Sequence, residues 1–196
     1  MSQSSHHQHD QETYTKTVFG FWIYLMTDFM MFAALFATFI VLRHNFFGGP
    51  PPKELFHLPY TFVQTAFLLL ASFASGVGGA FAHRGNKRGT LMAFGLTFLL
   101  GLVFFAMQTH EFLSLINSGN GWQRSAYLSA FFTLAGTQWM HMIIALLWVV
   151  LLLIPVIREG ITPVSVKRLT CLRIFWQFLY VIWIFIFACV YLMGVY

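Results

Sequence analysis

The residue best placed to do chemistry is Asp28, which interrupts a long apolar segment at residues 19–42. A charge at mid-membrane costs roughly 2.5–3.5 kcal/mol, so an acid in such a segment indicates a proton or cation pathway, or a contact buried inside protein. At helical spacing Asp28 belongs to a stripe that we expect to face protein rather than lipid. The other members of this stripe are Tyr24, Met31, Leu35 and Thr38.

Two later apolar segments carry further polar side chains. In residues 126–154, Thr133, Thr137 and His141 recur every four residues beside Gln138, and residues 172–193 contain Gln177 and Tyr180. Such groups hydrogen-bond between membrane helices, at about 0.6 kcal/mol each. They would serve either a proton relay with Asp28 or the cohesion of the helices. We favour cohesion, because one acid does not make a pathway and no broken helix is evident.

An aromatic stripe follows in the last apolar segment. Trp176, Tyr180 and Trp183 are spaced at i, i+4 and i+7, so they share one helix face,. This face is a candidate contact for another subunit or for a lipid, and ordinary packing explains it equally well.

The histidines do not predict a haem or metal site. A b-type haem between helices needs two axial ligands at the same depth, and His141 is the only histidine well inside an apolar segment,. Nucleophilic triads and phosphate-binding loops are also not evident. We therefore predict no catalytic or metal-binding residue in this chain. His6, His7 and His9 could bind a metal, but a solvated tail explains them better. Solvation at the outer surface likewise explains His44, His57 and His110 better than a metal site does, and His83 lies at the inner end of the second span.

Composition places the chain in the membrane. It is 58% hydrophobic and 9% charged, whereas soluble domains carry about 25% charged residues,. We predict an all-α integral membrane protein, with a polar flexible tail at residues 1–17 and one five-helix transmembrane domain at residues 18–196. The predicted spans are residues 19–42, 59–82, 90–109, 126–154 and 172–193,.

Lysine and arginine positions predict the orientation. With the N-terminus in the cytoplasm, eight of these residues lie inside and only Arg43, Lys53 and Arg124 lie outside,. We therefore expect the N-terminus inside and the C-terminus outside. The net charge of +5 is explained by this loop bias, and we predict no nucleic-acid binding.

Several stretches together resemble one family. They are GFWIYLMTDFMMFAALFATF, ELFHLPYTFVQTAFLLLAS, HEF, RSAYLSAFFTLAGT and RLTCLRIFWQFLYVIWIFIFACVYLMG. In order and spacing they resemble subunit III of the haem–copper terminal oxidases, most closely the five-helix form of cytochrome o (bo3-type) ubiquinol oxidases. The resemblance covers residues 18–196.

The resemblance implies an accessory subunit without a redox centre. It would pack directly against oxidase subunit I, which carries haem b, haem o and copper, in a complex with subunits II and IV in the bacterial inner membrane. The complex would oxidise ubiquinol, reduce oxygen to water and pump protons. Subunit III would support proton uptake and stabilise the catalytic subunit, with phospholipids in a cleft of V-shaped helices. Asp28 matches the family's intramembrane carboxylate.

The chain departs from the family pattern in two spans. The fourth span usually carries two histidines three residues apart, and here these are Gln138 and His141. The fifth span usually reads Trp-His-Phe and then Asp, whereas here Gln177 follows Trp176 and Tyr180 replaces the acid. We hypothesise that these groups are structural. Two alternatives stay open: subunit III of a cytochrome c oxidase, and a stand-alone transporter or lipid-binding membrane protein that uses Asp28.

Overall fold

The computed structural model describes residues 2–43, 45 and 58–192, with side chains from residue 15 onward. Within these ranges the chain contains no strand, and five helices are long and apolar enough to cross a membrane. The predicted all-α fold with five spans is therefore confirmed. The side chains of His6, His7, His9, His44 and His57 lie outside the described residues. The elements are α1 (Ser2–Leu42), α3 (Leu58–His83), α4 (Lys87–Asn117), α5 (Ala126–Glu159), α6 (Pro163–Ile186) and a π-helical turn, η1 (Phe187–Leu192).

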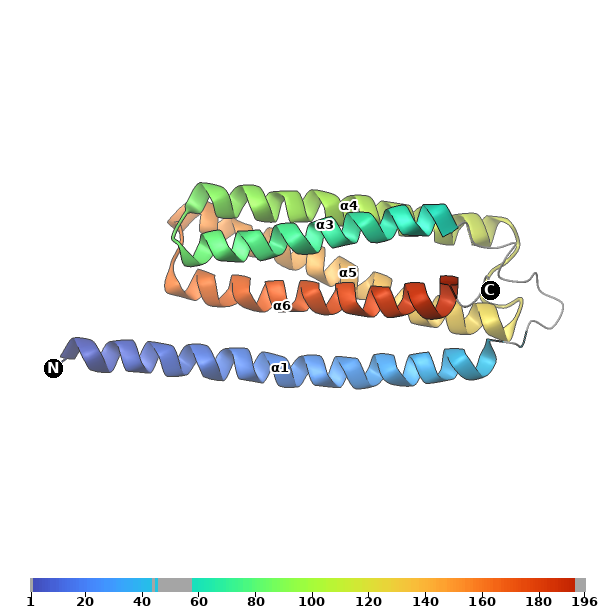
Figure 1. The fold of residues 1–196 in the computed structure, drawn as a ribbon, viewed down its shortest axis with the longest axis horizontal. Helices are drawn as coiled ribbons and strands as arrows, with labels where there is room; N and C mark the ends of the chain where they lie inside the picture. The colour runs from blue at the N-terminus through green and yellow to red at the C-terminus, as the bar shows by residue number, and fades with distance from the viewer. Residues whose placement is uncertain (1, 44, 46–57, 193–196) are drawn as a thin grey trace.

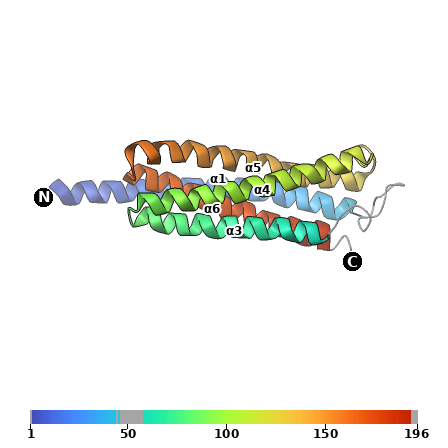
Figure 2. The same ribbon diagram turned by 90° about the horizontal axis from the view of Figure 1, so that it is seen from above.

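The helices form a four-helix bundle with one helix beside it. Helices α3 to α6 pack on one another, and α1 packs mainly on α5 and α6 (Figures 1 and 2). Successive helices run in opposite directions, so α1 begins at one end of the bundle and η1 finishes at the other (Figure 1). The turns α3–α4 and α5–α6 lie together at the end where α1 begins, because Lys87 Nζ donates to the Ile157 carbonyl at 2.8 Å. We call this the basic end.

Short polar residues set where three helices begin. Asn86, Ser125 and Thr162 each accept a hydrogen bond from the backbone N–H three residues later, at 3.1, 3.2 and 3.2 Å,. Pro163 then occupies the first turn of α6, where its missing N–H costs nothing,. Gly160, before this cap, takes φ of 84°, which lets the chain turn sharply from α5 into α6,.

The helices extend beyond the predicted spans. Residues 2–17, which we predicted as a flexible tail, continue α1, and α4 runs past His110 and Glu111 to Asn117. Helix α6 begins at Pro163 rather than near residue 172. Hydropathy marks the part of a helix that sits in hydrocarbon, whereas capping residues decide where the backbone hydrogen bonds begin.

The protein-facing stripe of α1 differs from the predicted one. Its buried residues are Leu25, Phe32 and Phe39, which repeat every seven residues. Asp28 and Leu35 border this stripe and are half-buried, but three predicted members are exposed. These exposed residues are Tyr24, Met31 and Thr38. Both faces of a membrane helix are apolar, so periodicity alone does not distinguish the face that packs on protein.

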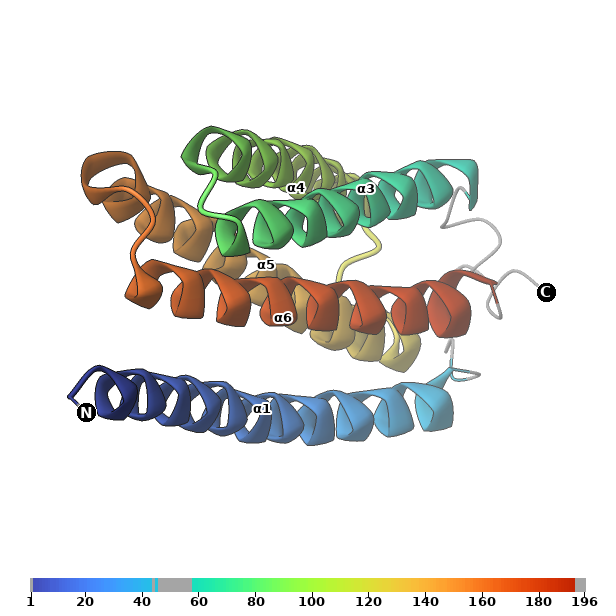
Figure 3. The ribbon, with the colours of Figure 1, turned by 60° about the vertical axis from the view of Figure 1, so that its left-hand side comes forward.

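Helix α1 lies alongside the bundle, and its first turns project beyond the basic end (Figure 1). Phe21 packs edge-on against Trp148 near the basic end, with ring centroids 5.6 Å apart, and Phe36 contacts Phe185 at 6.2 Å towards the opposite end. Figure 3 shows α1 following α6 without splaying away. Between Phe21 and Phe36, aromatic contacts therefore hold α1 close to the bundle, and no V-shaped opening separates it from α5 and α6 there.

Two of the three residues in the aromatic stripe of α6 fill the core, and Tyr180 is only half-buried. Trp176 and Trp183 are fully buried, and Trp183 Nε1 donates to Thr65 Oγ1 at 3.0 Å. Gly101 leaves room for one of these rings, since a Cβ there would come within 2.7 Å of Trp176 Cη2. Phe104 packs edge-on against Trp183 at 4.8 Å. These two tryptophans therefore join α6 to α3 and α4 by ordinary packing.

Candidate functional site

The structure brings the intramembrane acid to a histidine. Asp28 Oδ2 of α1 lies 3.8 Å from His141 Nε2 of α5, with the side chains 13% and 12% exposed. Asp28 is fourteenth of the 28 residues from Thr15 to Leu42, and His141 is sixteenth of the 34 residues of α5. Both groups therefore sit near the middle of their spans, where an acid needs a polar neighbour.

The other ring nitrogen of His141 indicates which atom exchanges a proton. His141 Nδ1 lies 2.8 Å from the Thr137 carbonyl oxygen. A carbonyl only accepts hydrogen bonds, so we assign the hydrogen to Nδ1. The nitrogen that faces Asp28 is then the one that gains or loses a proton. At 3.8 Å the pair is an ion pair when His141 is protonated, and the distance is too long for a direct hydrogen bond.

Aromatic rings enclose this pair. The ring of His141 lies 5.3 Å from that of Phe32 on α1 and 6.4 Å from that of Phe175 on α6. Tyr24, one helical turn before Asp28, interacts electrostatically with its carboxylate. The pair therefore joins α1 to α5 and is surrounded by aromatic side chains. Tyr24 is its polar neighbour on the side nearer the basic end.

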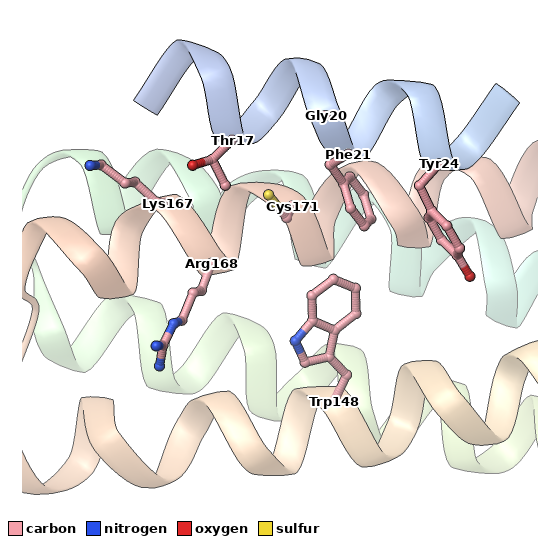
Figure 4. Close-up of a pocket in the computed structure, with 8 residues that line it drawn as sticks. All are labelled: Thr17, Gly20, Phe21, Tyr24, Trp148, Lys167, Arg168 and Cys171. Carbon is pink, nitrogen blue, oxygen red and sulfur yellow. The ribbon is translucent and has the colours of Figure 1, made fainter. Parts of the chain in front are cut away.

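Two pockets lie between α1 and α6, one on each side of the Asp28 level. The first, near the basic end, has a volume of about 390 Å³ and combines basic and aromatic side chains (Figure 4). The second has a volume of about 420 Å³ and is apolar. The first is lined by Thr17, Gly20, Phe21, Tyr24, Trp148, Lys167, Arg168 and Cys171. The second is lined by Phe29, Phe32, Ala33, Phe36, Ala37, Ile40, Ile182, Phe185 and Cys189.

The remaining predicted site residues separate into two groups. Gln138 is fully buried, and its Nε2 donates to the Leu179 carbonyl of α6 at 3.0 Å, so it joins two helices. Gln177 instead points out of the bundle and is exposed, and Tyr180 is half-buried. The structure thus brings Asp28 and His141 together but leaves Gln177 and Tyr180 away from them, on the other side of α6.

Sequence reasoning missed a second polar cluster. Gln64 Nε2 of α3 donates to Glu111 Oε2 of α4 at 3.5 Å, and Tyr191 of η1 is an electrostatic neighbour of Glu111. Glu111 lies inside α4, because the apolar residues after it continue the helix to Asn117. The sequence offered one signal of this cluster, because Gln108 is a polar residue one turn before Glu111. In the structure Gln108 is fully buried.

The described residues contain no group of three or more His, Cys, Asp or Glu side chains placed to bind a metal ion. Together, fold and site define a five-span membrane protein that holds an acid–imidazole pair at mid-depth and two pockets beside its first helix. The family model for cytochrome c oxidase subunit III matches residues 1–195. The chain belongs to the cytochrome c oxidase subunit III family.

Similar proteins come from several bacteria. The chain is 46% identical to the cytochrome bo(3) ubiquinol oxidase subunit 3 of Pseudomonas aeruginosa, over 96% of this chain and 90% of that protein. It is 36% identical to the quinol oxidase subunit 3 of Bacillus subtilis, over 95% and 92% of the two chains. It is 35% identical to the cytochrome c oxidase subunit 3 of Bacillus sp. PS3, over 89% and 84%.

Proposed function

We propose that this chain is the accessory, non-redox subunit III of a bo3-type ubiquinol oxidase in the aerobic respiratory chain of a bacterial inner membrane. The observation that carries this proposal is the 46% identity, over 96% of the chain, to a protein named as this subunit. The complex would oxidise ubiquinol, reduce oxygen to water and pump protons. This chain would stabilise the catalytic subunit and support proton uptake.

The redox cofactors would belong to other subunits. The family resemblance assigns haem b, haem o and copper to subunit I, which would contact this chain directly, with subunits II and IV in the same complex. The described histidines support this assignment, because His83, His110 and His141 lie at the end of α3, in the last two turns of α4 and in the middle of α5. Three histidines at such different levels do not form an axial pair for a haem.

The first pocket supports a lipid-binding role. Its basic residues, Lys167 and Arg168, lie towards the basic end, where phospholipid headgroups are expected, and its remaining lining is mostly aromatic and apolar (Figure 4),. The second pocket offers an apolar surface at the depth of acyl chains. We therefore propose that phospholipids occupy the space between α1 and α6. The basic end would face the cytoplasm, with the N-terminus inside.

A second candidate is subunit III of a cytochrome c oxidase. The relative from Bacillus sp. PS3 carries that name and is 35% identical over 89% of the chain. The electron donor is chosen by other subunits, so the two candidates differ in the complex and not in the fold of this chain.

The test is purification of the tagged chain from its own membranes under mild conditions, followed by a visible spectrum, subunit identification and oxygen uptake. Haem bands, a large haem-binding chain and oxygen uptake driven by ubiquinol are the expected results. Uptake driven by cytochrome c would support the second candidate. A colourless chain that purifies without other subunits would overturn both.

A further inference from the structure

Helix α6 presents three polar side chains away from the Asp28–His141 pair. Arg173, Gln177 and Tyr180 follow at i, i+4 and i+7, so they share one stripe,. Gln177 is exposed, and the other two are partly exposed. Gln177 is also the sixth residue of the apolar segment 172–193, which places its amide more than one helical turn inside the hydrocarbon,. Hydrocarbon cannot satisfy the hydrogen bonds of that amide.

Arg173 lacks an acceptor within the described part of the chain. Its Nε is buried and makes no hydrogen bond. The side chain lies across Gly79 of α3, where a Cβ would come within 3.0 Å of Arg173 Cδ and Nη1. None of the three described acids, Asp28, Glu111 and Glu159, forms a salt bridge with it. Gly79, which has no side chain, thus leaves room for the Arg173 side chain. The described residues contain no counterion for its charge.

Two contacts define the register of α3 against α6. Gly79 lies against Arg173, and Trp183 Nε1 donates to Thr65 Oγ1. Helices α3 and α6 run in opposite directions, so residues 72–76 of α3 lie at the level of the middle of α6.

The α3 surface at that level is made of small residues. Ser72 and Gly76 are both partly exposed and are four residues apart. A Cβ added to Gly76 would meet nothing within 4 Å, so open space lies over the backbone there. Pairs of small residues at this spacing allow a second helix to approach closely within a membrane. Next to them, Gln177 supplies a donor and an acceptor.

We infer that this surface of α3 and α6 docks a transmembrane helix of another subunit. The inference rests on the proposed function, which supplies the partner complex. Charge complementarity calls for an anionic group opposite Arg173, and for a hydrogen-bonding group opposite Gln177 one turn deeper. A phospholipid meets the first requirement through its phosphate but not the second, because acyl chains carry no hydrogen-bonding group at the depth of Gln177. The surface comprises Ser72, Gly76, Arg173, Gln177 and Tyr180.

Photo-crosslinking tests which kind of molecule covers this surface. A benzophenone amino acid replaces Gln177 in the intact complex, and the matched control places it at Leu99, which is 61% exposed on α4. We expect position 177 to yield a covalent adduct with another polypeptide, whose modified peptide lies in an apolar segment within two turns of an Asp or Glu. Adducts with lipid alone at position 177, at the yield found for position 99, would overturn the inference.

Charge variants provide the second measurement. Arg173→Gln is compared with Arg88→Gln, which makes the same charge change at an exposed position of α4. We expect Arg173→Gln to lower the amount of this chain that co-purifies with the haem-containing complex several-fold, at unchanged abundance in the membrane. Arg88→Gln should leave it unchanged. If a double variant that swaps Arg173 with the crosslinked acid restores co-purification, the two residues form an ion pair. If the Arg173→Gln and Arg88→Gln chains co-purify with the haem-containing complex in equal amounts, docking does not depend on Arg173.

The two proposals fail in different ways. A wild-type chain that purifies without haem refutes the proposed function, whatever position 177 contacts. A wild-type chain that brings haem with it, while position 177 labels only lipid, leaves the proposed function intact and refutes the docking surface.

Discussion

The contact between Asp28 and His141 should stabilise the closed position of α1 by an amount that a double-mutant cycle can measure. At 3.8 Å and an effective dielectric constant of about 20, two unit charges attract by about 4 kcal/mol before any desolvation cost,. Both side chains are largely buried, so desolvation offsets most of this,. Measured couplings between polar pairs in membrane bundles average about 0.6 and reach about 1.7 kcal/mol. We therefore expect about 1 kcal/mol, or roughly a fivefold change in the opening equilibrium of α1.

The assay reports on the opening of α1 directly. Leu25, which is buried against the bundle, is replaced by cysteine after Cys171 and Cys189 have been changed to alanine. A membrane-permeant thiol reagent then labels position 25 only when α1 moves away, at a rate proportional to the open population. Asp28→Leu and His141→Leu should each accelerate labelling. The double variant should label about five times more slowly than the product of the two single effects predicts.

The control is a cysteine at Met30, which is 72% exposed on the same helix and should label at one rate in all four backgrounds. If the single effects on position 25 simply multiply in the double variant, the two side chains do not interact. The closed position of α1 would then be held by its aromatic contacts alone, and the acid–imidazole pair would contribute nothing to it.

Three further predictions concern the bundle and its pockets. Gly101→Ala places a methyl group against the buried indole of Trp176 and should destabilise the purified complex by about 1–3 kcal/mol,. The control is Gly95→Ala, which should change thermal stability little because a Cβ there meets nothing within 4 Å. Gln138→Leu removes the hydrogen bond from α5 to an α6 carbonyl and should cost about 1 kcal/mol in the same thermal assay, with haem spectra unchanged,. Lys167→Gln combined with Arg168→Gln should reduce the phospholipid retained per complex, counted by mass spectrometry of extracted lipid.

Each of these three variants has its own refuting result. A fully stable Gly101→Ala complex would mean that α4 and α6 are not held at the described separation. Unimpaired assembly and stability with Gln138→Leu would remove the structural role of that amide. Unchanged lipid retention after loss of both cations would show that Lys167 and Arg168 do not hold a headgroup.

The number of spans and their approximate positions follow from sequence, because a bilayer requires a minimum apolar length. The helix ends follow less well. The beginning of α6 was indicated by Thr162 and Pro163, a capping residue followed by proline, but hydropathy is low there and the predicted span begins later. Helix α4 continues past Glu111 because a single polar residue does not end a helix,.

The site was predictable only in part. Asp28 is recognisable from its apolar surroundings, and His141 from its place inside a span. Their pairing was not, because α1 packs on α5 and α6, and adjacency between helices distant in sequence is set by packing that no local pattern records. The outward direction of Gln177 was missed for the same reason: both faces of α6 carry apolar residues, so neither is marked as the inner one.

The distance along the chain between Asp28 and His141 has a consequence for biosynthesis. The two residues are 113 positions apart, from 141 − 28. At a synthesis rate of roughly 5–20 residues per second, the carboxylate waits on the order of 6–20 s before its imidazole partner leaves the ribosome. Helix α1 must therefore enter the bilayer on the strength of its own apolar residues. A ribosome that stops before α5 would leave an unpartnered acid in the membrane, at a cost of roughly 2.5–3.5 kcal/mol.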